Sequence, residues 1–394
     1  RFVRRHRVGV AVATLAVGAV LTGAGVALQQ AREARAQRAQ DEGLLEFMLG
    51  DLRKRLQPVG RLDALDAVGE RALAYYAAQD AAGLDAESLS RRARALHLIG
   101  EIAERRGQLA EAEQRFTEAA RSTAERLARA PDDGERLFDH AQSEYWVGFI
   151  ARRRGQLPKA EAAMRRYLDL ADGLTRVAAR ADKPDWPLER PFAQQNLGVM
   201  VLEQGRSAEA LQLFDAAATS LGQYAGQRAD LSSAHATALG WVARARENLG
   251  DFAGAVATQQ AKLLALRPRS ESPQDDSNAR YSRAVALTEI SGLHMALGQQ
   301  PQALDAAAQA ADLLQVLVAR DPTNFDWAAQ AGLTRLQRAR SLWAGGQRDA
   351  AREEAGLAET LLAPLWATDG GKLYWHVRVR GALLGVLAMV QGIT

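Results

Sequence analysis

Apolar and polar positions along most of the chain follow a helical pattern, and glycines interrupt that pattern at a nearly constant interval. Two similar segments show the interval: RRGQLAEAEQRF at 105–116 and RRGQLPKAEAAM at 153–164 lie 48 positions apart. The interrupting glycines, spaced by 48, 50, 45, 48 and 48 residues, are Gly107, Gly155, Gly205, Gly250, Gly298 and Gly346. A constant period of this size predicts a stack of similar helical units.

Two further positions of each unit hold small residues. The fifth position after each turn glycine is always alanine: Ala112, Ala160, Ala210, Ala255, Ala303 and Ala351. The seventh position before it holds Gly100, Gly148, Gly198, Ala243, Ser291 and Ala339. Small residues on both helices allow two backbones to approach closely, and glycine permits the left-handed conformation that ends a helix. We therefore predict antiparallel helix pairs joined at these glycines, with longer second helices and linking loops than usual.

Partial units are predicted at both ends of the array. Gly60 lies 47 residues before Gly107 and indicates a degenerate leading pair. At the other end, Gly385 falls at the small-residue position and Gly392 at the turn position of a last, unpaired first helix. Single helices of this kind commonly seal an array, although the apolar composition of this one also fits an array that continues. The chain begins with Arg1 rather than Met, so we expect it to be the C-terminal piece of a longer polypeptide.

An apolar run near the N-terminus predicts a transmembrane helix. Residues 8–28 contain no charge over 21 positions, close to the roughly 20 residues that span a bilayer core. A signal peptide is the alternative, but its apolar region is shorter, about 7–15 residues. The four arginines in residues 1–7 favour an N-terminus on the inside, and arginines soon after the run weaken that bias. The predicted domains are a basic juxtamembrane stretch (1–7), a transmembrane helix (8–28), a charged connecting helix with the degenerate leading pair (29–90), and the repeat array with its capping helix (91–394).

Charge and motifs narrow the chemistry. The 50 basic and 47 acidic residues are interleaved and leave a net charge of +3, so we predict no nucleic-acid partner. The absence of cysteine excludes disulfides and thiol catalysis. The sequence contains no kinase signature, no phosphate-binding loop and no histidine spacing typical of zinc sites. We therefore predict no catalytic residue, cofactor or metal within this segment.

The remaining candidate for function is a binding surface. In such arrays the first helices line the concave side, and residues one turn apart face the same groove. The strongest cluster is Tyr145, Phe149 and Arg152, because aromatic residues and arginine dominate interface hot spots. The alternative is that the charges form a solvated face and the aromatic rings pack between repeats. The predicted groove for a protein or peptide comprises Arg94, His97, Glu101, Gln142, Tyr145, Phe149 and Arg152.

The repeat pattern, including Phe116 and Phe214 nine positions after their turn glycines, resembles the tetratricopeptide repeat, whose usual unit is about 34 residues. This resemblance implies a right-handed, all-α solenoid of about six helix pairs behind the predicted transmembrane helix. Residues 319–351, with Asp-Pro and a tryptophan before a helix pair, and residues 47–79 resemble the C-terminal half of bacterial membrane-anchored serine/threonine protein kinases.

The kinase resemblance implies a sensor or scaffold region of a signalling kinase whose catalytic domain is not in this chain. It also implies a membrane anchor with the catalytic domain on the cytoplasmic side. Together with the arginines of residues 1–7, this predicts a single-pass protein of the bacterial inner membrane, with the repeats in the periplasm. Two alternatives remain open: a repeat-bearing membrane scaffold or assembly factor without a kinase, and the tail of a protein with a Toll/interleukin-receptor-like domain. The sequence does not indicate the oligomeric state.

Overall fold

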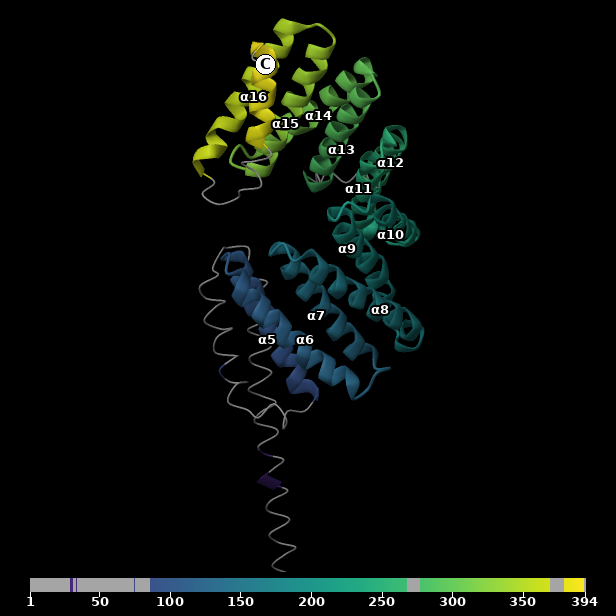
Figure 1. The fold of residues 1–394 in the computed structure, drawn as a ribbon. Helices are drawn as coiled ribbons and strands as arrows, with labels where there is room; N and C mark the ends of the chain where they lie inside the picture. The colour runs from purple at the N-terminus through teal and green to yellow at the C-terminus, as the bar shows by residue number, and fades with distance from the viewer. Residues whose placement is uncertain are drawn as a thin grey trace, which may run out of the picture. The chain divides into compact units, whose positions relative to one another are not determined.

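The computed structural model describes residues 86–267, 277–368 and 379–392, together with residues 29, 30, 33 and 74. These residues form thirteen α-helices and two short 3-10 helices, and the described part of the chain contains no strand (Figure 1). The chain divides into two compact units, residues 1–173 and 174–394. The predicted all-α fold is therefore confirmed.

The first unit contains two helix pairs. Their helices are α5 (Ala86–Arg105), α6 (Leu109–Ala128), α7 (Gly134–Arg153) and the first part of α8 (Leu157–Ala181). The carboxylate of Asp133 accepts hydrogen bonds from the backbone N–H groups of Glu135 and Arg136 and so caps the N-terminus of α7. An aspartate at this position satisfies N–H groups that have no partner within the helix, which explains why α7 starts there.

The second unit contains four helix pairs and one final helix. After the 3-10 helix η4 (Trp186–Leu188), its helices are α9 (Glu189–Glu203), α10 (Ser207–Gln227), α11 (Ser232–Asn248), α12 (Phe252–Ala265), α13 (Ser277–Ala296), α14 (Gln300–Arg320), α15 (Phe325–Ala344), α16 (Arg348–Thr368) and α18 (Gly381–Gln391), with η5 (Ala229–Leu231) before α11. In Figure 1 the members of each pair run side by side, for example α15 and α16.

All six turn glycines adopt the left-handed conformation that the sequence predicted. Their φ angles lie between 72° and 81°, and Gly392 has φ 71°. Residues with a Cβ rarely adopt such angles, which is why glycine recurs at these positions. The added length of each unit lies in the first helices as well as the second: α5, α7, α13 and α15 each have 20 residues.

The small-residue positions form the contact between paired helices. All six alanines that follow the turns are completely buried. In the first three pairs, a Cβ added to the glycine of the first helix would lie 2.5–2.7 Å from the large residue opposite. These contacts join Gly100 to Phe116, Gly148 to Met164 and Gly198 to Phe214. The register derived from the glycine interval is therefore confirmed by the packing.

The predicted membrane topology requires correction. Across residues 86–267, 277–368 and 379–392, every helix is too short or too polar to cross a bilayer. The fold class is therefore a tetratricopeptide-like α-solenoid without a membrane-spanning helix in it, and the assignment to a single-pass inner-membrane protein with periplasmic repeats is not supported. The apolar run that suggested a span, residues 8–28, lies outside the described residues, as do the predicted leading pair at Gly60 and most of residues 47–79.

Candidate functional site

The predicted groove residues lie on α5 and α7, the first helices of two consecutive pairs. Glu101 on α5 and Arg152 on α7 both act on the hydroxyl of Tyr145. Burial raises the pKa of this hydroxyl, Glu101 raises it further, and Arg152 acts in the opposite direction. A carboxylate and a guanidinium from two neighbouring first helices thus lie within electrostatic range of the Tyr145 phenol.

Tyr145 also belongs to a cluster of five aromatic rings. Its ring centroid lies 5.3 Å from that of Trp146, 6.3 Å from that of Phe149 and 6.0 Å from that of Tyr167. Trp146 in turn stacks on Phe116, with centroids 5.1 Å apart. Tyr145, Trp146 and Phe149 are half-buried, whereas Phe116 and Tyr167 are buried. The two predicted aromatic residues thus pack within the first unit and still keep part of their surface exposed.

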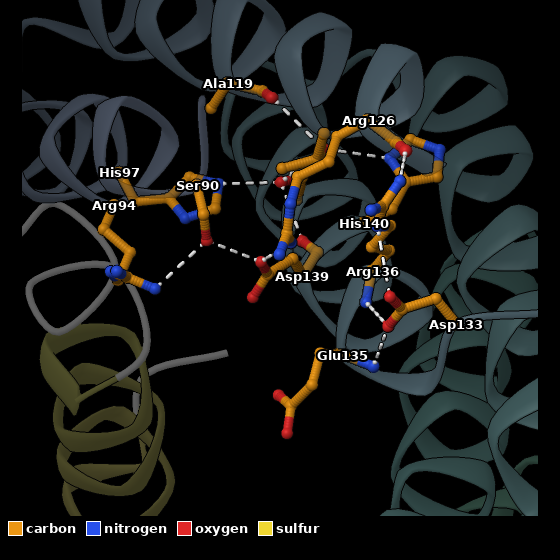
Figure 2. Close-up of polar contacts among 12 residues, drawn as sticks. Ser90, Arg94, His97, Ala119, Arg126, Asp133, Glu135, Arg136, Asp139 and His140 are labelled. Carbon is orange, nitrogen blue, oxygen red and sulfur yellow. Dashed lines mark hydrogen bonds and ion pairs between the residues drawn. The ribbon is translucent and has the colours of Figure 1, made fainter. Parts of the chain in front are cut away.

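Arg94 lies at the edge of a polar network that the sequence did not predict. Figure 2 shows its guanidinium bonded to the hydroxyl of Ser90, at 3.1 Å, and Ser90 bonded to the carboxylate of Asp139. Asp139 also pairs with Arg126, whose side chain is almost buried. The ion pair joins α6 to α7, and the Ser90–Asp139 hydrogen bond adds α5, so the network links three helices.

His97 belongs to a second branch of this network. Its Nε2 atom lies 3.1 Å from the hydroxyl of Ser143, and Thr123 donates to the same hydroxyl at 3.0 Å. Thr123 lies 3.0 Å from Nδ1 of His140. Ser143 donates to the carbonyl of Asp139, so both branches meet on α7. His97 therefore points into the contact between α5 and α7, and its predicted place in the groove is partly used for packing.

Burial is the main cause of the pKa shifts of two groups in the network. It raises the pKa of Asp139, against the opposing effects of the Ser90 hydroxyl and of Arg126 and Arg94. It lowers the pKa of His140, although Glu144 favours the charged ring. Removing a charged group from water disfavours its ionised form, which accounts for both directions.

The two remaining predicted residues differ in burial. Gln142 is half-buried, whereas Glu101 is buried, with 8% of its surface exposed. Within the residues that the structure describes, no group of three or more acidic or histidine side chains has the geometry to hold a metal ion. The site is thus a surface of aromatic and charged groups on helices that are joined by a network of polar contacts.

Comparison with known proteins identifies the fold of the chain but assigns the chain to no family. No protein-family model matches the sequence, and no curated protein matches it. The apo form of RapI is similar in structure, with 10% identity, a TM-score of 0.57, and coverage of 89% of this chain and 85% of that one. BtubC (BKLC) from P. vanneervenii shares 14% identity with a TM-score of 0.52, over 67% of this chain and 94% of that one.

A tetratricopeptide repeat protein from Parabacteroides merdae ATCC 43184 overlaps less closely, with 14% identity, a TM-score of 0.44, and coverage of 88% and 99% of the two chains. At these identities the similarity concerns the fold alone. The glycine-terminated helix pairs and the similarity to RapI and BtubC define this chain as a tetratricopeptide-like helical repeat protein.

Proposed function

We propose that the chain is a protein-interaction module and that its first unit binds a peptide or partner helix across α5 and α7. The observation that carries the proposal is the half-exposed cluster of Tyr145, Trp146 and Phe149 on α7, with Glu101 and Arg152 close enough to influence the charge of Tyr145. Aromatic rings together with an arginine have the composition of an interface hot spot. Tetratricopeptide-like folds are built to present such surfaces, and this supports a protein as the partner.

The polar network beneath the surface supports the same proposal. The Ser90–Asp139 and Ser143–His97 hydrogen bonds fix α5 relative to α7 before any partner arrives. A surface that is already ordered loses little conformational entropy on binding. The proposed binding surface is completed by Arg94, His97 and Gln142.

The test measures peptide binding to the full chain and to charge-reversed variants. Peptides selected by display against the wild-type chain are titrated into the Arg152→Glu variant. Loss of a hot-spot arginine weakens binding by at least about 2 kcal/mol, or roughly thirtyfold. The matched control is Arg165→Glu, which makes the same charge change on α8, where the side chain is half-exposed and pairs with Glu161.

Two results would contradict the proposal. One is a selection that enriches no peptide. The other is a set of peptides that bind wild type, Arg152→Glu and Arg165→Glu with equal affinity. Circular dichroism melts of each variant establish that the helices remain intact, because Arg152 also contributes to the surroundings of Tyr145.

We further propose that this module belongs to a signalling protein, with a bacterial serine/threonine protein kinase as the parent. The support is the resemblance of residues 319–351, where Asp321 and Pro322 precede Trp327 and a helix pair, to the repeat region of such kinases. The alternatives are a repeat-bearing scaffold or assembly factor without a kinase, and a protein with a Toll/interleukin-receptor-like domain. Reading the gene upstream of the Arg1 codon distinguishes the three, and a frame without kinase motifs overturns the first.

A further inference from the structure

The last helix, α18, has one packed face and one open face. Val379, just before it, and Leu383, Val386 and Val390 on it are buried against α15 and α16. The guanidinium of Arg352 on α16 donates to the carbonyl of Val390 at 3.2 Å and holds the end of the helix in place. In Figure 1 this yellow helix lies beside α15 and α16. We call the residues on its other side, Leu384, Gly385 and Ala388, the open face.

The open face carries the features of a first helix that has not received its second helix. Gly392 lies in the left-handed conformation of the six turn glycines. Leu384 lies eight positions before Gly392 and is 56% exposed. In the first five pairs, the residue at the same position is at most 6% exposed: Ile99, Val147, Leu197, Val242 and Ile290. Among the described residues, none covers this position on α18 as it is covered in those pairs.

The glycine position identifies what is missing. In the first three pairs the glycine seven positions before the turn contacts the large side chain nine positions after it. Gly385 occupies the same position on α18, and a Cβ added there would meet no atom within 4 Å. The terminal repeat of an array usually carries a polar outer face. The open face instead presents an exposed leucine beside a glycine on which nothing packs.

Two residues of each pair vary together in size: the one seven positions before the turn glycine and the one nine positions after it. Where the first helix has glycine, the second helix has Phe116, Met164 or Phe214. Where the first helix has alanine or serine, the corresponding residues are Gln259, Ala307 and Ala355. Because position 385 is glycine, its partner needs a phenylalanine or methionine. The fully buried alanines after the turns place an alanine four residues before that large side chain.

We propose that the open face of α18 binds an amphipathic helix of a partner protein that carries the pattern Ala-x-x-x-Phe or Ala-x-x-x-Met. The chain's own helices of this pattern are α6, α8 and α10. Their large residues, Phe116, Met164 and Phe214, are at most 2% exposed. A second copy of the chain therefore has no such helix available unless one of its own pairs opens.

The probe is a labelled peptide of residues 109–128, the sequence of α6. In its own pair α6 packs on α5, and α5 resembles α18 in having a glycine and an alanine, Gly100 and Ala103, at the positions of Gly385 and Ala388. Fluorescence anisotropy should report saturable binding to the full chain. The same peptide with Phe116→Ala should bind at least about tenfold more weakly, because it no longer buries the large apolar side chain.

Variants of the full chain locate the peptide. Gly385→Leu fills the empty position and should weaken peptide binding at least about tenfold. Gly356→Leu is the matched control, since Gly356 is an exposed helical glycine of α16 with no atom near its added Cβ. It should leave the affinity unchanged, and circular dichroism should give both variants the helix content of the wild type.

Three outcomes overturn the proposal. Absence of binding shows that the open face accepts no such helix. Binding that Gly385→Leu leaves unchanged shows that the peptide replaces α6 in its own pair. A chain that sediments as a dimer, is dissociated by Gly385→Leu and excludes the peptide shows that a second copy covers the open face instead.

Discussion

Substitution of Gly198 by alanine tests the packing rule of the helix pairs at a closely packed position. Gly198 lies on α9, and an added Cβ would lie 2.6 Å from Cε1 of Phe214 and within 3.0 Å of two more atoms of that ring. Phe214 is completely buried, so its ring has no free space into which it can turn. The methyl group therefore has to displace either the ring or the backbone of α9.

The expected magnitude combines two opposing terms. Overpacking a filled core costs about 1–3 kcal/mol. Alanine is also a better helix former than glycine by about 1 kcal/mol. Gly198→Ala should therefore change the free energy of unfolding by between about zero and 2 kcal/mol in the destabilising direction. Gly292→Ala on α13, where the added Cβ meets nothing within 4 Å, isolates the helix term and should be stabilising.

Urea unfolding followed by circular dichroism compares the two variants. Gly198→Ala should be less stable than Gly292→Ala by about 1–3 kcal/mol, the cost of overpacking. Phe214→Ala alone should cost about 3–5 kcal/mol through the cavity that it leaves. The Gly198→Ala, Phe214→Ala double variant should cost less than the sum of the two changes, because the new methyl group has room. Equal effects of the two glycine substitutions, or strict additivity, would refute the reasoning.

Three further predictions concern the polar network and the turns. Asp139→Ala should destabilise the first unit by about 3–5 kcal/mol in urea unfolding, because Arg126 keeps its buried charge without a partner, and adding Arg126→Leu should recover part of the loss. His140→Gln should flatten the fall in stability between about pH 7 and 5. Burial lowers the pKa of His140, so protonation favours the unfolded chain, and unfolding at several pH values measures the slope. Gly250→Ala should lower the free energy of unfolding by about 1–2 kcal/mol, and Gly250→Asn by less, because φ is +80° there.

The helix pairs were predictable because their constraints fall on single residues. A left-handed turn selects glycine at Gly107, and a close helix contact selects alanine at Ala112, whatever the rest of the unit contains. Because the same residues recur in six units, the pattern can be distinguished from a chance match. The membrane topology was inferred from one apolar run, its flanking arginines and a family resemblance, and no repetition or contact supported that inference.

The candidate site was less predictable because it depends on which side of a helix turns inward. Counting along α5 placed Arg94 and His97 together in a groove, yet His97 bonds to Ser143 on the next first helix. The sequence also gave no reason to pair Arg126 with Asp139, since the two belong to different helices of different pairs. Contacts of this kind follow from the relative rotation of neighbouring helices, which a single helical pattern does not specify.

One regularity in these contacts is nevertheless visible in the register. His97 lies ten positions before its turn glycine, and its partner Ser143 lies twelve positions before the next one. Thr288 and Thr334 occupy the same two positions in the last two pairs, and their hydroxyl oxygens lie 2.7 Å apart. In the four other pairs the residue twelve positions before the turn is alanine, which has no polar atom to offer.

This recurrence indicates that serine or threonine at that position supplies a hydrogen bond between successive first helices. A hydrogen bond is directional, whereas apolar contacts tolerate sliding, so each such pair fixes the rotation of one helix against the next. The first unit has both this bond and the buried Arg126–Asp139 ion pair, and both involve α7, the helix that carries Tyr145, Phe149 and Arg152. The rotation of α7 against α5 and α6 is therefore fixed before any partner binds.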